Sequence, residues 1–214
     1  MTFAVPQINR LPVDQRGVTL ADFLVPIRLS ERVSARVRNV ALVALGALFI
    51  YLTALIVFPV PGSPVPVTGQ TFGVLLDGGA LGFKRGVAAV GLYVLIGLIG
   101  LPFFAENKGG VSVILGATGG YIIGFILAGG LVGRLAELGW DRRLVGAIAA
   151  MAIGNVVIYL VGVPWLMVVT GYDLQEAIAK GVTPFIVGDL IKLALAGAAF
   201  PAAWWLVGRR PGDR

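Results

Sequence analysis

Long apolar runs with almost no charged residues dominate this 214-residue chain and leave few folds open to it. A helix needs about 20 apolar residues to cross the hydrocarbon core of a bilayer. Only 13% of the residues are charged, whereas a soluble domain has about 25%. The pattern predicts an all-α integral membrane protein built as a bundle of six transmembrane helices. The apolar runs lie at about 39–58, 70–83, 86–101, 117–137, 144–170 and 183–207.

The second and third runs are short and rich in glycine. The segment GGALGFKRG (78–86) joins them, so we expect a tight helical pair inside the bundle. A single re-entrant feature is the alternative for this pair. Six spans is the preferred count.

Basic residues predict the orientation, because cytoplasmic loops of membrane proteins are enriched in Lys and Arg. All but three of the 17 basic residues fall in segments that six spans place on one side. The exceptions are Lys108 and Lys180 in the opposite loops and Lys192 inside the last span. Both termini are therefore expected to be cytoplasmic. The net charge of +6 reflects this topology and not a nucleic-acid partner.

Three regions follow from these patterns. A basic cytoplasmic extension covers 1–37, with a short amphipathic helix on the inner leaflet over 27–37. A partly disordered basic tail is an equal alternative for 1–18. The extension lacks the apolar core and cleavage site of a signal peptide. The six-helix membrane domain covers 38–208, and a cytoplasmic tail covers 209–214.

The chain contains no Cys and no His. Disulfides, thiolate metal sites and cysteine nucleophiles are therefore excluded, as are the commonest metal ligand and general base. No GxxxxGK[ST] motif occurs, so the chain has no P-loop for ATP hydrolysis. An intramembrane enzyme would need a Ser–Lys dyad, and Ser112 has no evident link to Lys192. We expect no enzyme, no catalytic residue, no metal and no cofactor.

Two charged residues stand inside the last apolar run, in GDLIKLALAG (188–197). Asp189 and Lys192 are three residues apart and share a helix face. Either charge would cost about 3 kcal/mol if it faced lipid, so both must face the bundle interior. One interpretation is an ion pair that locks the fold. The favoured one is a ligand site with a carboxylate acceptor and an ammonium donor, because other polar residues converge at the same depth.

Depth along the helices, at about 1.5 Å per residue, places these other residues in the outer half of the bundle. They are Gln70, Thr118, Tyr121, Asn155, Tyr159 and Trp165. Tyr121 and Trp165 would cover the apolar body of a small ligand, as is usual in small-molecule pockets. Asp77 is the exception in the inner half, where it can pair with Lys84 or Arg85.

Two outer loops complete the expected site. The prolines of PVPGSPVPVTGQ (59–70) favour a stiff, extended connection, either a lid or wall above a cavity or a rigid linker. The longer loop LPFFAENKGGVSVILG (101–116) carries Asn107 between two charged residues and before two glycines. Long loops of this kind often carry binding function. In the span that follows, Gly120 and Gly124 have the spacing that permits close helix approach, as do Gly116 and Gly120.

Five segments in order along residues 40–207 resemble the BioY family, the biotin-specific substrate-capture (S) components of energy-coupling factor (ECF) vitamin transporters. The segments are PVPVTGQTFGVLL (64–76), GLPFFAENKGG (100–110), GATGGYIIGF (116–125), GNVVIYLVGVPWL (154–166) and GDLIKLALA (188–196). The resemblance implies a six-helix S-component fold in the inner (cytoplasmic) cell membrane, with a biotin site at its outer face.

The resemblance also implies roles for single residues. Asp189 and Lys192 match the aspartate and lysine that contact biotin in similar proteins. Gln70, Thr118 and Tyr121 fall within matching motifs and rank second, and the amides of Asn107 and Asn155 rank third.

Partners follow from the same resemblance. An ECF transmembrane coupling subunit and two ATPase subunits would supply the energy, so ATP would act only through that module. Solitary action, with a homo-oligomer as the functional unit, is the alternative. An S component for another vitamin, such as thiamin or riboflavin, also remains open. A proton-coupled carrier is a further alternative, but it needs ionisable groups leading inward, and only Asp77 is available.

Overall fold

The computed structural model describes residues 19–24 and 34–207, and in this part of the chain helices predominate. The helical class predicted from the apolar runs is therefore confirmed. One of the longer helices coincides with most of each run. These helices are α3 (Ala35–Ala54), α4 (Gln70–Leu81), α5 (Phe83–Leu98), α7 (Gly119–Glu137), α8 (Leu144–Thr170) and α10 (Ile186–Val207). The α3 and α5 helices begin a few residues before their runs. The tails 1–18 and 208–214, and most of the amphipathic helix expected over 27–37, lie outside the described residues.

Four helical stretches among the described residues are long and apolar enough to cross a membrane, and α4 and α5 are not among them. With 12 and 16 residues, these two helices are shorter than a full span. The four stretches are Ala35–Ala54, Gly119–Glu137, Leu144–Thr170 and Leu174–Leu206. The chain is thus a multi-pass membrane protein.

The first apolar run is not helical to its end. The α3 helix begins after the N-cap Ser34, whose hydroxyl accepts from the Val37 amide, and ends at Ala54. Residues Val57–Phe58 (β1) then pair antiparallel with Val67–Thr68 (β2). Hydropathy alone could not separate β1 from the helix, because its residues are equally apolar. The proline-rich connection is therefore a hairpin.

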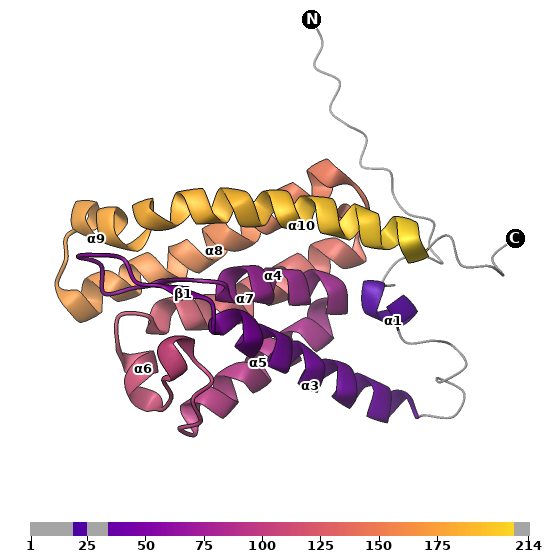
Figure 1. Cartoon of the computed structure of the whole chain (residues 1–214), viewed down its shortest axis with the longest axis horizontal. Helices are drawn as coiled ribbons and strands as arrows, with labels where there is room; N and C mark the ends of the chain where they lie inside the picture. Colours follow the sequence, from indigo (N-terminus) through magenta and orange to yellow (C-terminus); the bar gives the residue numbers. More distant parts are fainter. Residues whose placement is uncertain (1–18, 25–33, 208–214) are drawn as a thin grey trace, which may run out of the picture.

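Smaller helices lie between the long ones. The loop after α5 forms a 3-10 turn over Ala105–Asn107 and the short helix α6 (Val111–Leu115). The loop after α8 contains α9 (Leu174–Gly181), which the sequence analysis did not anticipate. Its N-cap Asp173 accepts from the Glu176 amide at 2.8 Å. Figure 1 shows the β1–β2 hairpin, α6 and α9 together at one end of the bundle.

Close glycine contacts hold the centre of the bundle together. A Cβ atom on Gly78 of α4 would lie 2.3 Å from the carbonyl oxygen of Gly129 in α7, so these backbones touch. A Cβ on Gly120 would lie 2.2 Å from Cβ of Trp165, and one on Gly124 would lie 3.1 Å from Cα of Ile158. The close approach predicted for Gly120 and Gly124 is therefore confirmed, against α8. Gly116 precedes α7, and a Cβ on it would meet the carbonyl oxygens of Ser112 and Val113 in α6 and not α8.

The opposite end of the bundle carries α1 (Leu20–Leu24) (Figure 1). Arg85, in the first turn of α5, binds both carboxylate oxygens of Asp22 at 2.8 and 3.0 Å and donates to the Thr19 hydroxyl at 2.9 Å. Leu20 and Ala21 are buried against the bundle. Part of the N-terminal extension is thus packed on the membrane domain.

The pairing suggested for Asp77 is wrong. Arg85 is engaged by Asp22, and Asp77 makes no ion pair or hydrogen bond with Lys84 or any other described residue. Asp77 is nevertheless only 6% exposed, and its Oδ1 fills the space that a side chain at Gly46 would take. The α4 helix turns this carboxylate toward Gly46 of α3.

Candidate ligand-binding site

A cavity of about 300 Å³ lies at the end of the bundle formed by the hairpin, α6 and α9. The hairpin and the 101–116 loop line it together with the N-terminal ends of α4, α7 and α10 and the middle of α8. This volume is at the lower end of the range of small-molecule sites, about 300–1,000 Å³. Its polar side chains are Thr68, Gln70, Thr71, Glu106, Lys108, Ser112, Thr118, Tyr121, Asn155, Tyr159, Asp189 and Lys192.

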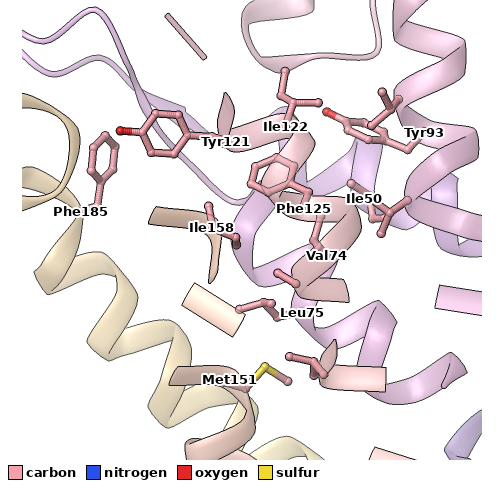
Figure 2. Close-up of a cluster of buried hydrophobic side chains, with 14 of the residues drawn as sticks. Ile50, Val74, Leu75, Tyr93, Tyr121, Ile122, Phe125, Met151, Ile158 and Phe185 are labelled. Atoms are coloured by element: carbon pink, nitrogen blue, oxygen red, sulfur yellow. The ribbon is translucent and has the colours of Figure 1, made fainter. Parts of the chain in front are cut away.

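The apolar wall of the cavity is formed by side chains that also belong to the buried core. Figure 2 shows Tyr121, Ile122, Phe125 and Ile158 in one cluster, with Phe185 beside Tyr121. The same cluster continues down to Met151 (Figure 2). A ligand surface placed against this wall would contact side chains that core packing already fixes, so the wall is preformed.

The first two turns of α10 supply one of the ion pairs that line the cavity. Lys192 Nζ lies 3.1 Å from Asp189 Oδ1, and the Tyr159 hydroxyl donates to Asp189 Oδ2. Lys192 Nζ also donates to the Thr71 hydroxyl at 2.7 Å. Asp189 lies in the first turn of α10, where the helix dipole favours a negative charge. The shared face predicted for Asp189 and Lys192 is confirmed, and the two residues pair with each other.

Three other predicted residues line the cavity while their hydrogen bonds go to protein groups. The Gln70 amide donates to the Tyr93 hydroxyl and accepts from Thr68. The Tyr121 hydroxyl donates to the Gly181 carbonyl at 2.9 Å, and that of Thr118 lies 3.5 Å from the Val113 carbonyl. Gln70, Tyr121 and Thr118 thereby fix the shape of the wall.

Asn155 differs from these three. It is 7% exposed, it lines the cavity, and its amide has no hydrogen bond within the part of the chain that the structure describes. Buried amides normally have a partner. Asn155 is therefore the lining residue best able to offer a donor and an acceptor to a ligand.

Two expected residues do not reach the cavity. Asn107 is exposed and has a left-handed backbone (φ 55°), and it is absent from the lining that its neighbours Glu106 and Lys108 join. Trp165 donates to the Gly116 carbonyl at 2.9 Å and packs on Gly120, so it holds α7 against α8. The turn at 106–107 decides which side chain points inward, and composition does not reveal that turn.

The cavity also includes residues that the sequence analysis did not select. Thr71 follows Gln70 directly and binds Lys192. Glu106 and Lys108 form an ion pair with 2.5 Å between Oε2 and Nζ. The motif that contains Gln70 could have pointed to Thr71. Its contact with Lys192, 121 positions away, becomes visible only when α4 and α10 are packed together.

Comparison with known proteins identifies the family to which this chain belongs. The model of the BioY family matches residues 28–209. The chain belongs to the BioY family. The biotin transporter BioY of Thermotoga maritima is 43% identical over 148 residues, which cover 67% of this chain and 86% of that protein. The probable biotin transporter BioY of Pyrococcus horikoshii is 42% identical over 155 residues, or 72% and 90% of the two chains.

A solved structure agrees with this membership. The crystal structure of the S-component for biotin from an ECF-type ABC transporter superposes with a TM-score of 0.72 at 29% identity. The match covers 78% of this chain and 90% of that one. The bundle is thus an ECF S-component fold. The α1 helix precedes the residues that the BioY family model matches.

Proposed function

We propose that this BioY protein captures biotin in the cavity and is the substrate-binding subunit for biotin uptake. The observation that carries the proposal is the Asp189–Lys192 pair, which faces a cavity of about 300 Å³ that also has an apolar wall. The BioY relatives are named as biotin transporters, and the solved structure is an S-component for biotin. Membership of a transporter family supports a transport role and not catalysis.

The chemistry of biotin suits these side chains. The ureido ring has two N–H donors and a carbonyl acceptor, and the valerate chain ends in a carboxylate. Asp189 can accept from the N–H groups, and Lys192 can donate to a carbonyl or carboxylate oxygen. The Asn155 amide can form hydrogen bonds with either the ureido ring or the carboxylate. The wall formed by Ile122, Phe125 and Ile158 suits the apolar sulfur ring and chain.

The proposal includes a topology. All six long helices cross the inner (cytoplasmic) membrane, both termini are cytoplasmic, and the cavity opens outward. The domain boundaries are those predicted from the sequence, with 38–208 as the membrane domain between a 1–37 extension and a 209–214 tail. The proline-rich hairpin supports this arrangement, since Pro64, Val65 and Pro66 form part of the cavity wall.

In this proposal, other subunits supply the energy for biotin uptake. The ECF S-component fold supports a partnership with an ECF module, consisting of a transmembrane coupling subunit and two ATPase subunits. A homo-oligomer is the functional unit if the protein works alone. Uptake of biotin in cells that lack the ATPase subunits separates these two modes.

Retention of radiolabelled biotin by the purified protein tests the proposed ligand. We expect Asp189→Asn and Lys192→Met each to raise the biotin Kd at least about 30-fold, because each leaves its partner charge unpaired, at about 2 kcal/mol or more. Lys84→Met, an exposed lysine at the opposite end of the bundle, is the matched control and should bind normally. Retention of thiamin or riboflavin in place of biotin would refute the assignment.

A further inference from the structure

The hydroxyl of Thr71 belongs to a chain of hydrogen bonds that joins three helices across the cavity. Lys192 Nζ in α10 donates to Thr71 Oγ1 in α4 at 2.7 Å and to Asp189 Oδ1 at 3.1 Å. Tyr159 in α8 donates to the other carboxylate oxygen of Asp189. The chain therefore runs from α4 through α10 to α8. Thr71 is its α4 end.

The chemistry of an ammonium group makes this bond significant. A lysine side chain has four flexible carbons and loses much rotamer entropy when it is fixed, so its head group is poorly placed unless acceptors hold it. The Lys192 ammonium has three N–H donors. Two are used within the described part of the chain, by Thr71 from one helix and Asp189 from another. One N–H is left for an acceptor in the cavity.

Asp189 alone would not hold Lys192 in this way. Both residues lie on α10, and an ion pair within one helix lets the ammonium swing around the carboxylate. The Thr71 hydroxyl pulls the ammonium toward α4 from a separate helix, so it fixes the direction of the remaining N–H. Lys192 is 17% and Asp189 9% exposed at the side chain, so little water competes for these bonds.

We propose that Thr71 is a positioning residue of the ligand site, which acts by holding Lys192 so that one N–H of its ammonium points at an oxygen acceptor of the ligand. This inference rests on the proposed function, in which the ligand is biotin and the acceptor is its carbonyl or carboxylate oxygen. Thr71 sets affinity for that oxygen through Lys192 and not through a contact of its own.

Substitutions at Thr71 test the role of the hydroxyl. Thr71→Val keeps the branched shape and removes the hydrogen bond, and we expect the biotin Kd to rise about 10-fold or more, as for the loss of a bond to a charged group. Thr71→Ser keeps the hydroxyl and should restore most of the affinity. Thr170→Val is the matched control, because its hydroxyl bonds the Leu166 carbonyl outside the cavity. The biotin Kd of Thr170→Val should therefore equal that of the wild type.

A double-mutant cycle with Lys192→Met separates positioning from direct contact. If Thr71 acts through Lys192, Thr71→Val should cause no further loss in the Lys192→Met background. An equal loss in both backgrounds, or wild-type affinity in Thr71→Val, overturns the inference. Weak binding is read from the rise in Tm at millimolar biotin, which extends the measurable range.

Different binding results would overturn the inference and the proposed function. If wild-type protein does not bind biotin, the proposed function fails. If wild-type protein binds biotin and Thr71→Val does so equally well, only the positioning role fails. The Tm of each unliganded variant shows whether the protein is folded.

Discussion

Asp189 and Lys192 pair with each other, and both also keep hydrogen-bonding capacity toward the cavity. Each carboxylate oxygen of Asp189 has one protein partner and can accept a second bond. The ion pair and the ligand site, which were competing interpretations of the sequence, are therefore compatible. The pair keeps both charges satisfied in a poorly hydrated place.

Asp77 is the residue whose environment is least favourable. Its carboxylate is 6% exposed and has no partner among the described residues. An unsatisfied buried polar group costs about 1–3 kcal/mol. We expect Asp77→Ala to raise the Tm of the purified protein, and Asp22→Ala, which removes a paired carboxylate, to lower it. A lower Tm for Asp77→Ala would mean that this carboxylate stabilises the fold.

Asp141 gives the protein a pH-dependent contribution to stability. It lies between α7 and α8, it is 3% exposed, and its Oδ2 accepts from Trp204 Nε1 at 2.6 Å. Burial raises the pKa of Asp141 from 3.8 to about 6, against smaller opposing effects of the Trp204 bond and the Arg142 charge. The folded state thus holds this proton more tightly than the unfolded state does.

The folded state therefore loses stability as pH rises from about 4 to about 6, on the order of 3 kcal/mol from this group. Asp141→Asn removes the titration. We expect the Tm of Asp141→Asn minus that of wild type to increase over this pH range and then level off. Thermal melts from pH 4 to 8 measure it, and a constant difference would contradict the prediction.

At the scale of elements, the contact between α4 and α7 depends on the absence of side chains. A Cβ on Gly78 would meet backbone atoms of Gly129 at 2.3 Å and 2.9 Å, and backbone cannot move aside cheaply. Gly91 in α5 has no atom within 4 Å of a built Cβ. The two positions are both helical glycines, so they form a matched pair.

We expect Gly78→Ala to destabilise the protein by at least about 2 kcal/mol, because α4 and α7 must separate. Gly91→Ala should be neutral or stabilising by up to about 1 kcal/mol, since alanine is the better helix former. Denaturation of both variants in the same detergent makes the comparison. Equal stability would show that α4 and α7 are less closely packed than in this structure.

At the scale of the whole molecule, the docked α1 helix lies at the end of the bundle opposite the hairpin and α6 (Figure 1), two elements that line the cavity. Burial alone would raise the pKa of Asp22, but the hydrogen bonds and charge of Arg85 and the Thr19 bonds lower it. The Asp22–Arg85 pair thus stays ionised. It ties α1 to the first turn of α5.

This separation predicts that stability and affinity can be changed independently. Asp22→Asn should lower the Tm by a few degrees, since the Arg85 charge loses its partner, and should leave the biotin Kd unchanged. Deletion of residues 1–24 should have the same two effects. Isothermal titration and thermal melts of the same preparations test both. A changed Kd would show that the two ends are coupled.

Long-range properties of the sequence determined the class of the protein and the place of its main charges. Hydropathy averaged over about 20 residues is dominated by the bilayer requirement, so each long helix could be located. Helical periodicity then put Asp189 and Lys192 on one inward face. Gln70, Tyr121, Asn155 and Tyr159 reached the cavity because they lie at matching heights on neighbouring helices.

Only the tertiary structure decided which polar groups meet. The bond from Lys192 to Thr71 depends on how α10 is rotated against α4, and a short loop turn put Glu106 and Lys108 at the cavity in place of Asn107. Likewise, Arg85 binds Asp22 and leaves Asp77 alone because α1 folds back onto the bundle. The physical reason is that hydropathy acts on whole segments, whereas a hydrogen bond depends on positions fixed to within a few tenths of an ångström by packing.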